Sequence, residues 1–352
     1  MAYRVGIVGA SPLVTNRPST APYPLVGEII QSHVASISAL ADLELVAICD
    51  LRQKRLETFV ELWNDRWPDV QTYADYQTML ERENLDVLTV ATPDDRHAQI
   101  VLDSIMAGIK GILCEKPIAT SLETADKMIE ACKRAKVPMV VNYTRRWMPL
   151  YHKVRETIRE GAIGQLISMS ATHGGPRAML FRNGTHYLDG MCFFAEAEPQ
   201  LVWAVLENGF DHWDRYLGDG GTDPSLEPSA DGFVRFTNGI NAHYRGSKMI
   251  PTISKMELTG TTGQIEFMMD GRTATLIPDG STPIDVQQIT LQTDLYQIQG
   301  MIAVYQELTT LIEDGGESIC SPEEARKALQ IALGFLKSHS QGSQLINLAA
   351  TD

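Results

Sequence analysis

The sequence predicts an α/β protein in two parts. Residues 1–142 are expected to form a Rossmann-type, doubly wound parallel sheet, and residues 143–352 an α+β domain with a largely antiparallel sheet. Short apolar runs alternate with helical patterns up to residue 141, which is typical of parallel strands joined by helices. After Tyr143, strand-like runs follow one another with turn signals between them, which indicates antiparallel pairing.

The first part is predicted to alternate strand and helix throughout. The expected strands are 5–9, 43–49, 87–91, 111–114 and 138–141, and the expected helices are 27–41, 55–67, 76–82, 98–107 and 121–135. Such an order places helices on both faces of one sheet.

The second part is predicted to begin and end with helices. The expected helices are 150–160, 295–313 and 322–338, and the expected strands are 166–172, 201–207, 232–237, 240–244, 254–259, 264–268 and 273–277. Thr237-Asn238-Gly239 predicts a hairpin. The helix 322–338 is expected to pack back on the first domain. Residues 207–231 have no periodicity and predict a long surface loop, which is either a lid or subunit contact or an ordinary insertion.

Composition excludes several classes of protein. The chain of 352 residues is 44% hydrophobic and 21% charged, which argues for a globular protein and against disorder. Its net charge of −14 argues against nucleic-acid and anionic-membrane partners. Neither a secretory signal nor a membrane-spanning apolar run is visible, so a cytoplasmic protein is expected. The five cysteines form no CxxC pair, which predicts reduced thiols and no zinc site.

A glycine-containing turn after the first strand indicates a nucleotide site. Gly6, Gly9 and Ala10 resemble the opening of a dinucleotide-binding turn, in which the backbone approaches a pyrophosphate closely. The usual GxGxxG pattern is incomplete, and residues 14–24 interrupt it as an insertion. This motif is therefore weak when it is taken alone.

An acidic residue at the end of the second strand strengthens the nucleotide-site prediction. Asp50 stands where a carboxylate accepts hydrogen bonds from the ribose hydroxyls of NAD. Arg52 and Arg55 lie nearby and leave NADP open as the cofactor, and a turn-forming role for Asp50 also remains open.

The Glu115-Lys116-Pro117 step is the most informative feature of the chain. It follows the apolar run Ile112 to Cys114, so Lys116 is expected at the carboxyl end of a buried strand. Open α/β sheets bind their ligands at that edge. The alternative is a surface lysine in a loop.

Further motifs give the chain a family resemblance. Four further segments carry it, in chain order: Asp86 to Pro93 followed by His97, Tyr143 to Trp147, Asn183 to Asp189, and Ser321 to Ala325. Together with Glu115-Lys116-Pro117, they resemble the glucose–fructose oxidoreductase, inositol dehydrogenase and rhizopine catabolism (Gfo/Idh/MocA) family of NAD(P)-dependent oxidoreductases. The resemblance runs nearly end to end.

The resemblance implies roles for particular residues. Thr92, Pro93, His97 and Glu115 would lie at the cofactor, and an NAD-dependent enzyme acting on a small sugar or cyclitol is expected. Tyr143, Arg146, Arg182, Asn183 and Asp189 are the candidates for the substrate site. A homodimer or homotetramer formed through the second-domain sheet is also implied.

One position departs from the family pattern. Family members often carry an aspartate four residues before the histidine of the Asn183 to Asp189 motif, where this chain has Arg182. Either Asn183 takes over part of that role, or the chemistry differs.

Oxidation of a hydroxyl group requires a base and a group that stabilises the developing alkoxide. Lys116 is expected to hydrogen-bond the reacting oxygen and His186 to take the proton, while Asp189 orients the imidazole. A buried structural histidine is the alternative for His186. No metal site is expected, since His173, His186, His212 and Asp189 lack diagnostic spacing.

Three functions remain open. The first is an NAD(P)-dependent dehydrogenase that oxidises a secondary hydroxyl of a sugar, glycoside or cyclitol. The second is a redox-neutral enzyme that retains NAD and catalyses elimination, epimerisation or glycoside cleavage through a transient ketone. The third is a non-catalytic NAD-binding regulator, for which Lys116 and His186 would both be unnecessary.

Overall fold

The computed structural model describes residues 2–20, 28–218, 223–269, 273–280, 287–290 and 300–350. The chain divides into two compact units. The first comprises Met1–Ala119, Glu123–Trp147 and Asp294–Glu323, and the second comprises Thr120–Leu122, Met148–Thr293 and Glu324–Asp352. The predicted single boundary after residue 142 therefore lies five residues before the boundary after Trp147, and a later segment returns to the first unit.

The first unit contains a six-stranded sheet in which every neighbouring pair is parallel. The strands in spatial order are β5 (Gln71–Tyr73), β4 (Leu43–Cys49), β1 (Tyr3–Val8), β6 (Val87–Val90), β7 (Gly111–Cys114) and β8 (Met139–Val141). This is the Rossmann order, and it confirms the predicted fold. β5 was not predicted, because this strand has only three residues and is largely exposed.

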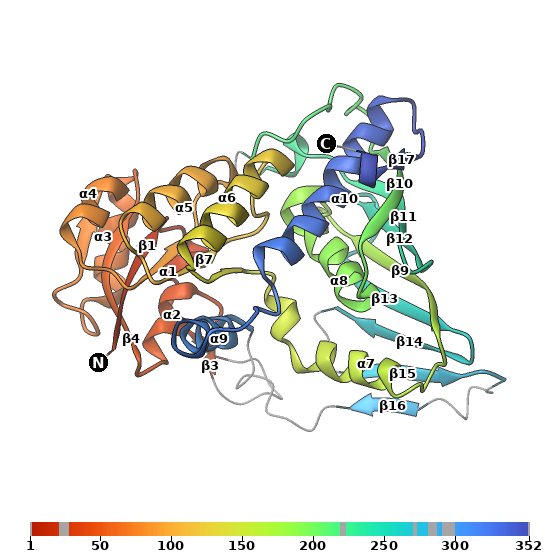
Figure 1. Ribbon diagram of the computed structural model, residues 1–352, viewed down its shortest axis with the longest axis horizontal. Helices are drawn as coiled ribbons and strands as arrows, with labels where there is room; N and C mark the ends of the chain where they lie inside the picture. The colour runs from red at the N-terminus through yellow and green to blue at the C-terminus, as the bar shows by residue number, and fades with distance from the viewer. Residues whose placement is uncertain are drawn as a thin grey trace. The chain divides into compact units, whose positions relative to one another are not determined.

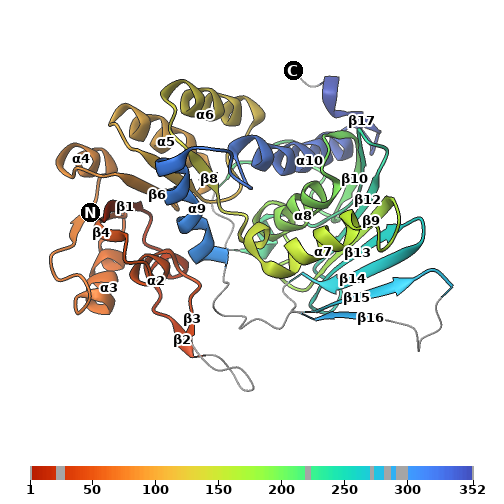
Figure 2. The same ribbon diagram turned by 60° about the horizontal axis from the view of Figure 1, so that its bottom comes forward.

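Helices cover both faces of this sheet (Figures 1 and 2). One face carries α2 (His33–Ser38), α3 (Gln53–Trp63) and α9 (Gly300–Asp314), and the other carries α4 (Tyr76–Arg82), α5 (His97–Met106) and α6 (Leu122–Ala135). α9 contacts α2, β7 and β8. It packs closely on β7 because Gly111 has no side chain there: a Cβ atom would lie 2.6 Å from Ile312 Cδ1.

The predicted helix over 27–41 is wrong in its first part. α2 begins only after Ser32, whose side chain accepts a hydrogen bond from the backbone N–H of Ala35 and so caps the helix. Before it, β3 (Glu28–Ile29) pairs with β2 (Ser19–Thr20) in a short antiparallel ladder. The insertion after the glycine-containing turn also includes α1 (Pro12–Thr15). Residues 21–24 of the insertion, residue 27 of the predicted helix 27–41 and residues 295–299 of the predicted helix 295–313 lie outside the described residues.

The second unit contains a nine-stranded sheet that is antiparallel except between β9 and β12. In spatial order its strands are β16 (Gln287–Thr290), β15 (Thr273–Pro278), β14 (Gly263–Met268), β13 (Ile253–Gly260), β9 (Leu166–Gly174), β12 (Asn241–Ser247), β11 (Ala230–Phe236), β10 (Pro199–Leu206) and β17 (Ile346–Asn347). The largely antiparallel sheet is thereby confirmed. The hairpin predicted at Thr237-Asn238-Gly239 joins β11 to β12, with Gly239 at a φ of 89°.

Three helices cover one face of the large sheet: α7 (Pro149–Arg159), α8 (Thr185–Ala195) and α10 (Pro322–Ser340) (Figure 2). α10 begins in the first unit and continues through the second. Within the second unit its Phe335 fills the space above Gly232, where a Cβ atom would lie 2.4 Å from the ring. Ser338 Oγ accepts a hydrogen bond from Ala204 N at 3.0 Å.

Two further observations concern the cysteines and the helices. All five cysteines are buried and free, as expected for reduced thiols. Among the helices that the structure describes, none combines the length and the apolar character that crossing a membrane requires.

Candidate active site

Gly9 forms the tight turn at the carboxyl end of β1. Its φ is 105°, and a Cβ atom would lie 2.3 Å from the carbonyl oxygen of Ala91, so only glycine fits. Gly6 lies within the strand, where a Cβ atom would lie 2.5 Å from Leu85 Cδ1, so the absent side chain leaves room for Leu85. The structure thus gives Gly6 a packing role and Gly9 a backbone role.

Asp50 connects the turn after β1 to the turn after β4. Its carboxylate accepts hydrogen bonds from the backbone N–H groups of Ala10 and Arg52, both at 2.8 Å, and from Arg55 Nη1 at 3.1 Å. Asp50 is 8% exposed. The structure therefore supports the turn-forming role, and ribose binding stays a prediction.

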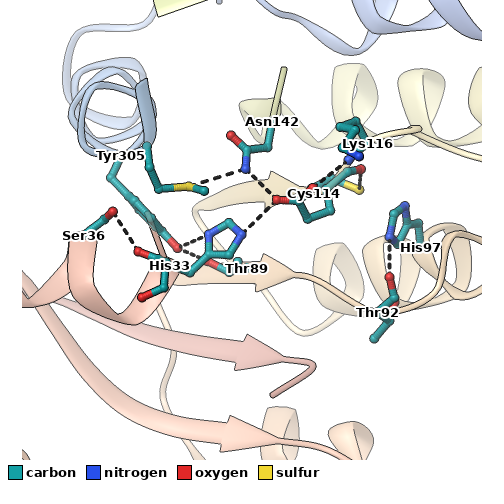
Figure 3. Close-up of polar contacts among 12 residues, drawn as sticks. His33, Ser36, Thr89, Thr92, His97, Cys114, Lys116, Asn142 and Tyr305 are labelled. Carbon is teal, nitrogen blue, oxygen red and sulfur yellow. Dashed lines mark hydrogen bonds and ion pairs between the residues drawn. The ribbon is translucent and has the colours of Figure 1, made fainter. Parts of the chain in front are cut away.

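His97 connects two loops that follow neighbouring strands. Its Nδ1 lies 3.0 Å from the carbonyl oxygen of Pro117, and its Nε2 lies 3.1 Å from that of Thr92. A carbonyl oxygen only accepts, so a neutral imidazole donates to one of these groups and an imidazolium to both. His97 is completely buried, and it holds the Thr92–Pro93 loop to the turn after Lys116 (Figure 3).

Glu115 follows β7 directly and is surrounded by donors. Its Oε1 accepts hydrogen bonds from Asn142 Nδ2 at 2.5 Å and from His33 Nε2 at 3.0 Å. Burial alone would raise the pKa of this carboxyl group, but the hydrogen bond and charge of His33, the charge of Lys116 and the hydrogen bond of Asn142 together lower it to about 2. Glu115 is therefore a carboxylate at neutral pH.

Lys116 lies at the carboxyl end of β7, as the sequence predicted. Its backbone N–H donates to Glu115 Oε2 at 3.3 Å, and the peptide bond to Pro117 is cis. The residue is partly exposed. Lys116 thus has a carboxylate beside it and a turn, held by His97, after it (Figure 3).

Two buried oxygen atoms at this edge have no hydrogen-bond partner within the described part of the chain. They are Thr92 Oγ1, after β6, and Asn142 Oδ1, after β8. Buried polar atoms seldom lack a partner, so these oxygens fit a site that a polar ligand completes. Together with the backbone turn at Gly9, they are consistent with a nucleotide cofactor along the carboxyl ends of β1, β6 and β8.

Two of the predicted substrate residues are buried in the first unit. Tyr143 is 0% exposed and Arg146 is 2% exposed. Arg146 Nη1 donates to the carbonyl oxygen of Ile319 at 2.7 Å, and so holds the segment between α9 and α10. A substrate role for either residue stays a prediction.

His186 and Asp189 lie on α8 of the second unit. His186 is in the first turn and partly exposed, and Asp189, one turn later, is 2% exposed. A π-helical turn, Leu180–Gly184, leads directly into α8. Only glycine fits at position 184, because a Cβ atom there would lie 2.5 Å from Tyr244 Oη. Such turns occur often at functional sites.

The π-helical turn is held by an acidic residue from the 207–231 loop. Glu227 is 3% exposed, and its Oε1 accepts from the backbone N–H groups of Phe181 and Arg182 at 2.6 and 2.9 Å. Asn183 Nδ2 donates to the carbonyl oxygen of Arg177 at 2.8 Å. A carboxylate from a distant segment therefore organises the backbone at the position where the family's aspartate is missing.

Among the described residues, no group of three or more His, Cys, Asp or Glu side chains is arranged to hold a metal ion.

Two models of a single family match this chain. The oxidoreductase family model with an NAD-binding Rossmann fold covers residues 26–143, and the Gfo/Idh/MocA C-terminal domain model covers residues 151–266. The chain belongs to the Gfo/Idh/MocA oxidoreductase family. At the level of the family, the predictions of an oxidoreductase and of an NAD cofactor are thereby confirmed.

Individual relatives in the Gfo/Idh/MocA family share a quarter to a third of the matched residues. A D-apiose dehydrogenase from Paraburkholderia graminis is 33% identical over 138 residues, which is 39% of this chain and 36% of that protein. An inositol 2-dehydrogenase from Rhizobium meliloti is 25% identical over 338 residues, 91% of this chain and 96% of that protein. The chain thus spans about a third of the first relative's length and nearly all of the second's.

A solved structure shares the fold of this chain. An oxidoreductase from Agrobacterium radiobacter, in complex with NAD⁺, L-tartaric acid and magnesium, superposes with a TM-score of 0.77 over 100% of both chains. The sequence identity is 18%, so the likeness concerns the fold.

Sequence reasoning missed three residues that hold the candidate segments: His33 and Asn142 in the first unit and Glu227 in the second. His33 carried a signal, because it stands among apolar and small residues in a predicted helix, and a buried imidazole requires a partner. Asn142 follows the last predicted strand and could have been recognised from that position. Glu227 carried no signal, because it lies in a segment without periodicity.

Proposed function

We propose that this protein is an NAD-dependent dehydrogenase that oxidises a secondary hydroxyl group of a sugar, glycoside or cyclitol. The observation that carries the proposal is Lys116 at the carboxyl end of β7, beside a carboxylate whose pKa is lowered to about 2. A non-catalytic nucleotide-binding protein has no need of such a pair. The names of the relatives, D-apiose dehydrogenase and inositol 2-dehydrogenase, support the substrate class.

The residues fit an NAD cofactor at the edge that Gly9, Thr92 and Asn142 line. NAD, when bound, supplies the acceptor for the hydride that leaves the carbinol carbon. Lys116 hydrogen-bonds the reacting oxygen and stabilises its negative charge as the O–H proton leaves. His186 takes that proton, and Asp189 holds the imidazole. Glu115 keeps Lys116 in place.

The test is a dehydrogenase assay with a matched pair of lysine variants. Purified protein is screened with NAD and then NADP against sugars, glycosides and cyclitols by NADH absorbance. Lys116→Ala is expected to lower kcat by at least about a hundredfold while NAD affinity stays within about threefold. Lys110→Ala, which removes an exposed lysine paired with Asp86 at the start of β7, is the control and is expected to retain activity. Full activity of Lys116→Ala would contradict the proposal.

Nucleotide released by denaturing the freshly purified protein distinguishes the alternatives. An empty protein that turns over added NAD supports the dehydrogenase. Stoichiometric NAD with product formation and no absorbance change would instead indicate the redox-neutral enzyme. Binding of NAD without turnover on any substrate would indicate a regulator.

We also propose that the protein assembles as a homodimer or homotetramer through the second sheet. On the face opposite the helices, Trp203 and Val205 of β10 are 37% and 38% exposed. Trp203 is paired across strands with Phe233, and Phe233 with His243. This apolar row supports contact with a second copy.

A further inference from the structure

A network of hydrogen bonds in the interior of the first unit includes Thr89, Tyr305, His33 and Asn142, which Figure 3 labels, and reaches Glu115. Thr89 Oγ1 lies 2.8 Å from Tyr305 Oη, which lies 3.0 Å from His33 Nδ1. His33 Nε2 lies 3.0 Å from Glu115 Oε1, which also accepts from Asn142 at 2.5 Å. Each contact is within hydrogen-bond distance, so these five residues form one continuous network.

The five residues come from five separate segments of the chain. Thr89 belongs to β6, Tyr305 to α9 and His33 to α2, while Glu115 and Asn142 follow β7 and β8. All but Glu115 are at most 2% exposed, and the Glu115 side chain is 23% exposed. The network therefore connects a buried interior to the residue that precedes Lys116.

The direction of each hydrogen bond follows from the chemistry of the groups. A carboxylate only accepts, so Asn142 donates through its amide nitrogen and His33 donates through Nε2. His33 Nδ1 then either accepts from Tyr305, which accepts from Thr89, or donates to Tyr305, which donates to Thr89. Burial raises the pKa of Tyr305, so this phenol keeps its proton in both arrangements. Every hydrogen bond is therefore made whether His33 is neutral or cationic.

We propose that His33 is a positioning residue for Lys116 that acts through Glu115. Tyr305 and Thr89 hold the imidazole so that Nε2 points at the carboxylate. The hydrogen bond from Nε2 keeps the carboxylate turned toward Lys116, whose backbone N–H it accepts at 3.3 Å. The role in the reaction rests on the function proposed above, whereas the positioning of Lys116 does not.

The charged and titratable groups around Glu115 define what the proposal predicts. The His33 hydrogen bond and the Lys116 charge both act on the Glu115 carboxylate. Glu115 and Asp94 both act on the Cys114 thiol, whose pKa is raised well above its ordinary value, first by burial and then by these carboxylates. Without the hydrogen bond from His33, the Glu115 carboxylate turns away from Lys116, and its charge interaction with the Lys116 amine weakens. The uncharged, reactive fraction of the amine then increases.

The test measures the reactivity of Lys116 in the protein without substrate. Reductive methylation is followed by mass spectrometry of the peptide that contains Lys116, across a pH series. His33→Leu is expected to raise the rate at Lys116 at least about threefold and to shift its pH dependence to lower pH. His33→Gln, whose amide can still donate to Glu115, is expected to restore the wild-type rate. An unchanged rate in His33→Leu would overturn the proposal.

A second pair of variants keeps the test decisive if His33→Leu does not fold. Tyr305→Phe removes only the hydroxyl group that holds Nδ1 and is expected to raise the Lys116 rate at least about twofold. Tyr76→Phe is its control, because it removes a hydroxyl group hydrogen-bonded at 2.6 Å to Asp103 in the same unit. Lys110, which is held by Asp86, is the internal control in each digest. Equal Lys116 rates in Tyr305→Phe and Tyr76→Phe would overturn the proposal.

Activity separates this proposal from the proposed function. Once a substrate is found, His33→Leu is expected to lower kcat at least about tenfold, with KM for NAD within about threefold. If labelling of Lys116 changes as expected but Lys116→Ala stays active, the positioning holds and the proposed function fails. If Lys116→Ala is inactive but labelling is unchanged, the proposed function holds and the positioning fails.

Discussion

At the scale of single residues, Glu115 shows how neighbours determine a charge. Burial favours its neutral form, yet His33, Lys116 and Asn142 outweigh burial and lower its pKa from 4.5 to about 2. A lowered pKa contributes stability that is complete above the ordinary value and is lost as pH falls through the folded value. The carboxylate therefore stabilises the folded protein at neutral pH.

Glu115→Gln is expected to remove this contribution. The difference in unfolding free energy between the native protein and the variant should reach at most about 3 kcal/mol at about pH 6 and fall by more than half at about pH 3. Urea denaturation at a series of pH values measures it. A difference that does not change with pH would mean that the charge of Glu115 contributes nothing.

Gly9 allows a test of backbone shape. Gly9→Ala places a methyl group 2.3 Å from the carbonyl oxygen of Ala91 at a φ of 105°, so a loss of about 3 kcal/mol or more is expected, together with weaker NAD binding. Gly108→Ala is the matched control, because its φ is 85° and no atom lies within 4 Å of the added carbon. The control should lose only about 1 kcal/mol in thermal or urea unfolding. Equal losses would show that the contact with Ala91 is unimportant.

At the scale of elements, Glu227 holds the π-helical turn that leads into α8. Glu227→Ala leaves the backbone N–H groups of Phe181 and Arg182 without this acceptor, and is expected to lower the unfolding free energy by about 1–3 kcal/mol and to reduce kcat. Asp223→Ala is the control in the same loop, since its carboxylate accepts from the backbone N–H of Ser225 at an exposed position. The control should change stability by less than about 0.5 kcal/mol. The unfolding free energy and kcat are measured for both variants, and equal losses in the two would contradict the expectation.

The sequence predicted the bounds of helices and strands better than the contacts between side chains of distant segments. The helix at Tyr76–Arg82 and the strand at Gly111–Cys114 have the predicted bounds, because each has its own capping or apolar signal. The start of α2 was misplaced, because nothing in the pattern excludes a helix over the pair of residues that forms β3. The position of Lys116 was predicted because it follows from the end of one strand. His33 was missed because its partners Glu115 and Tyr305 lie 82 and 272 residues away.

At the scale of the whole molecule, the exposed row on the second sheet allows a test of assembly. Light scattering after size exclusion is expected to give a dimer or tetramer. The double variant Trp203→Arg with Val205→Arg should shift it to the monomer, because the added charges would lie against the same face of a second copy. Met106→Arg, at an 87% exposed position of the first unit, is the control and should assemble normally. A monomeric native protein would contradict the proposed assembly.

The return of α9 to the first unit determines the order in which the protein can mature on the ribosome. All six strands of the first sheet are translated before the nine-stranded sheet, yet the helix that packs on β7 and supplies Tyr305 to His33 is translated after β16. Until then, the nascent Rossmann half exposes apolar surface and an imidazole without its phenol partner. Premature termination before residue 300 therefore leaves an incomplete nucleotide-binding half that chaperones and proteases recognise.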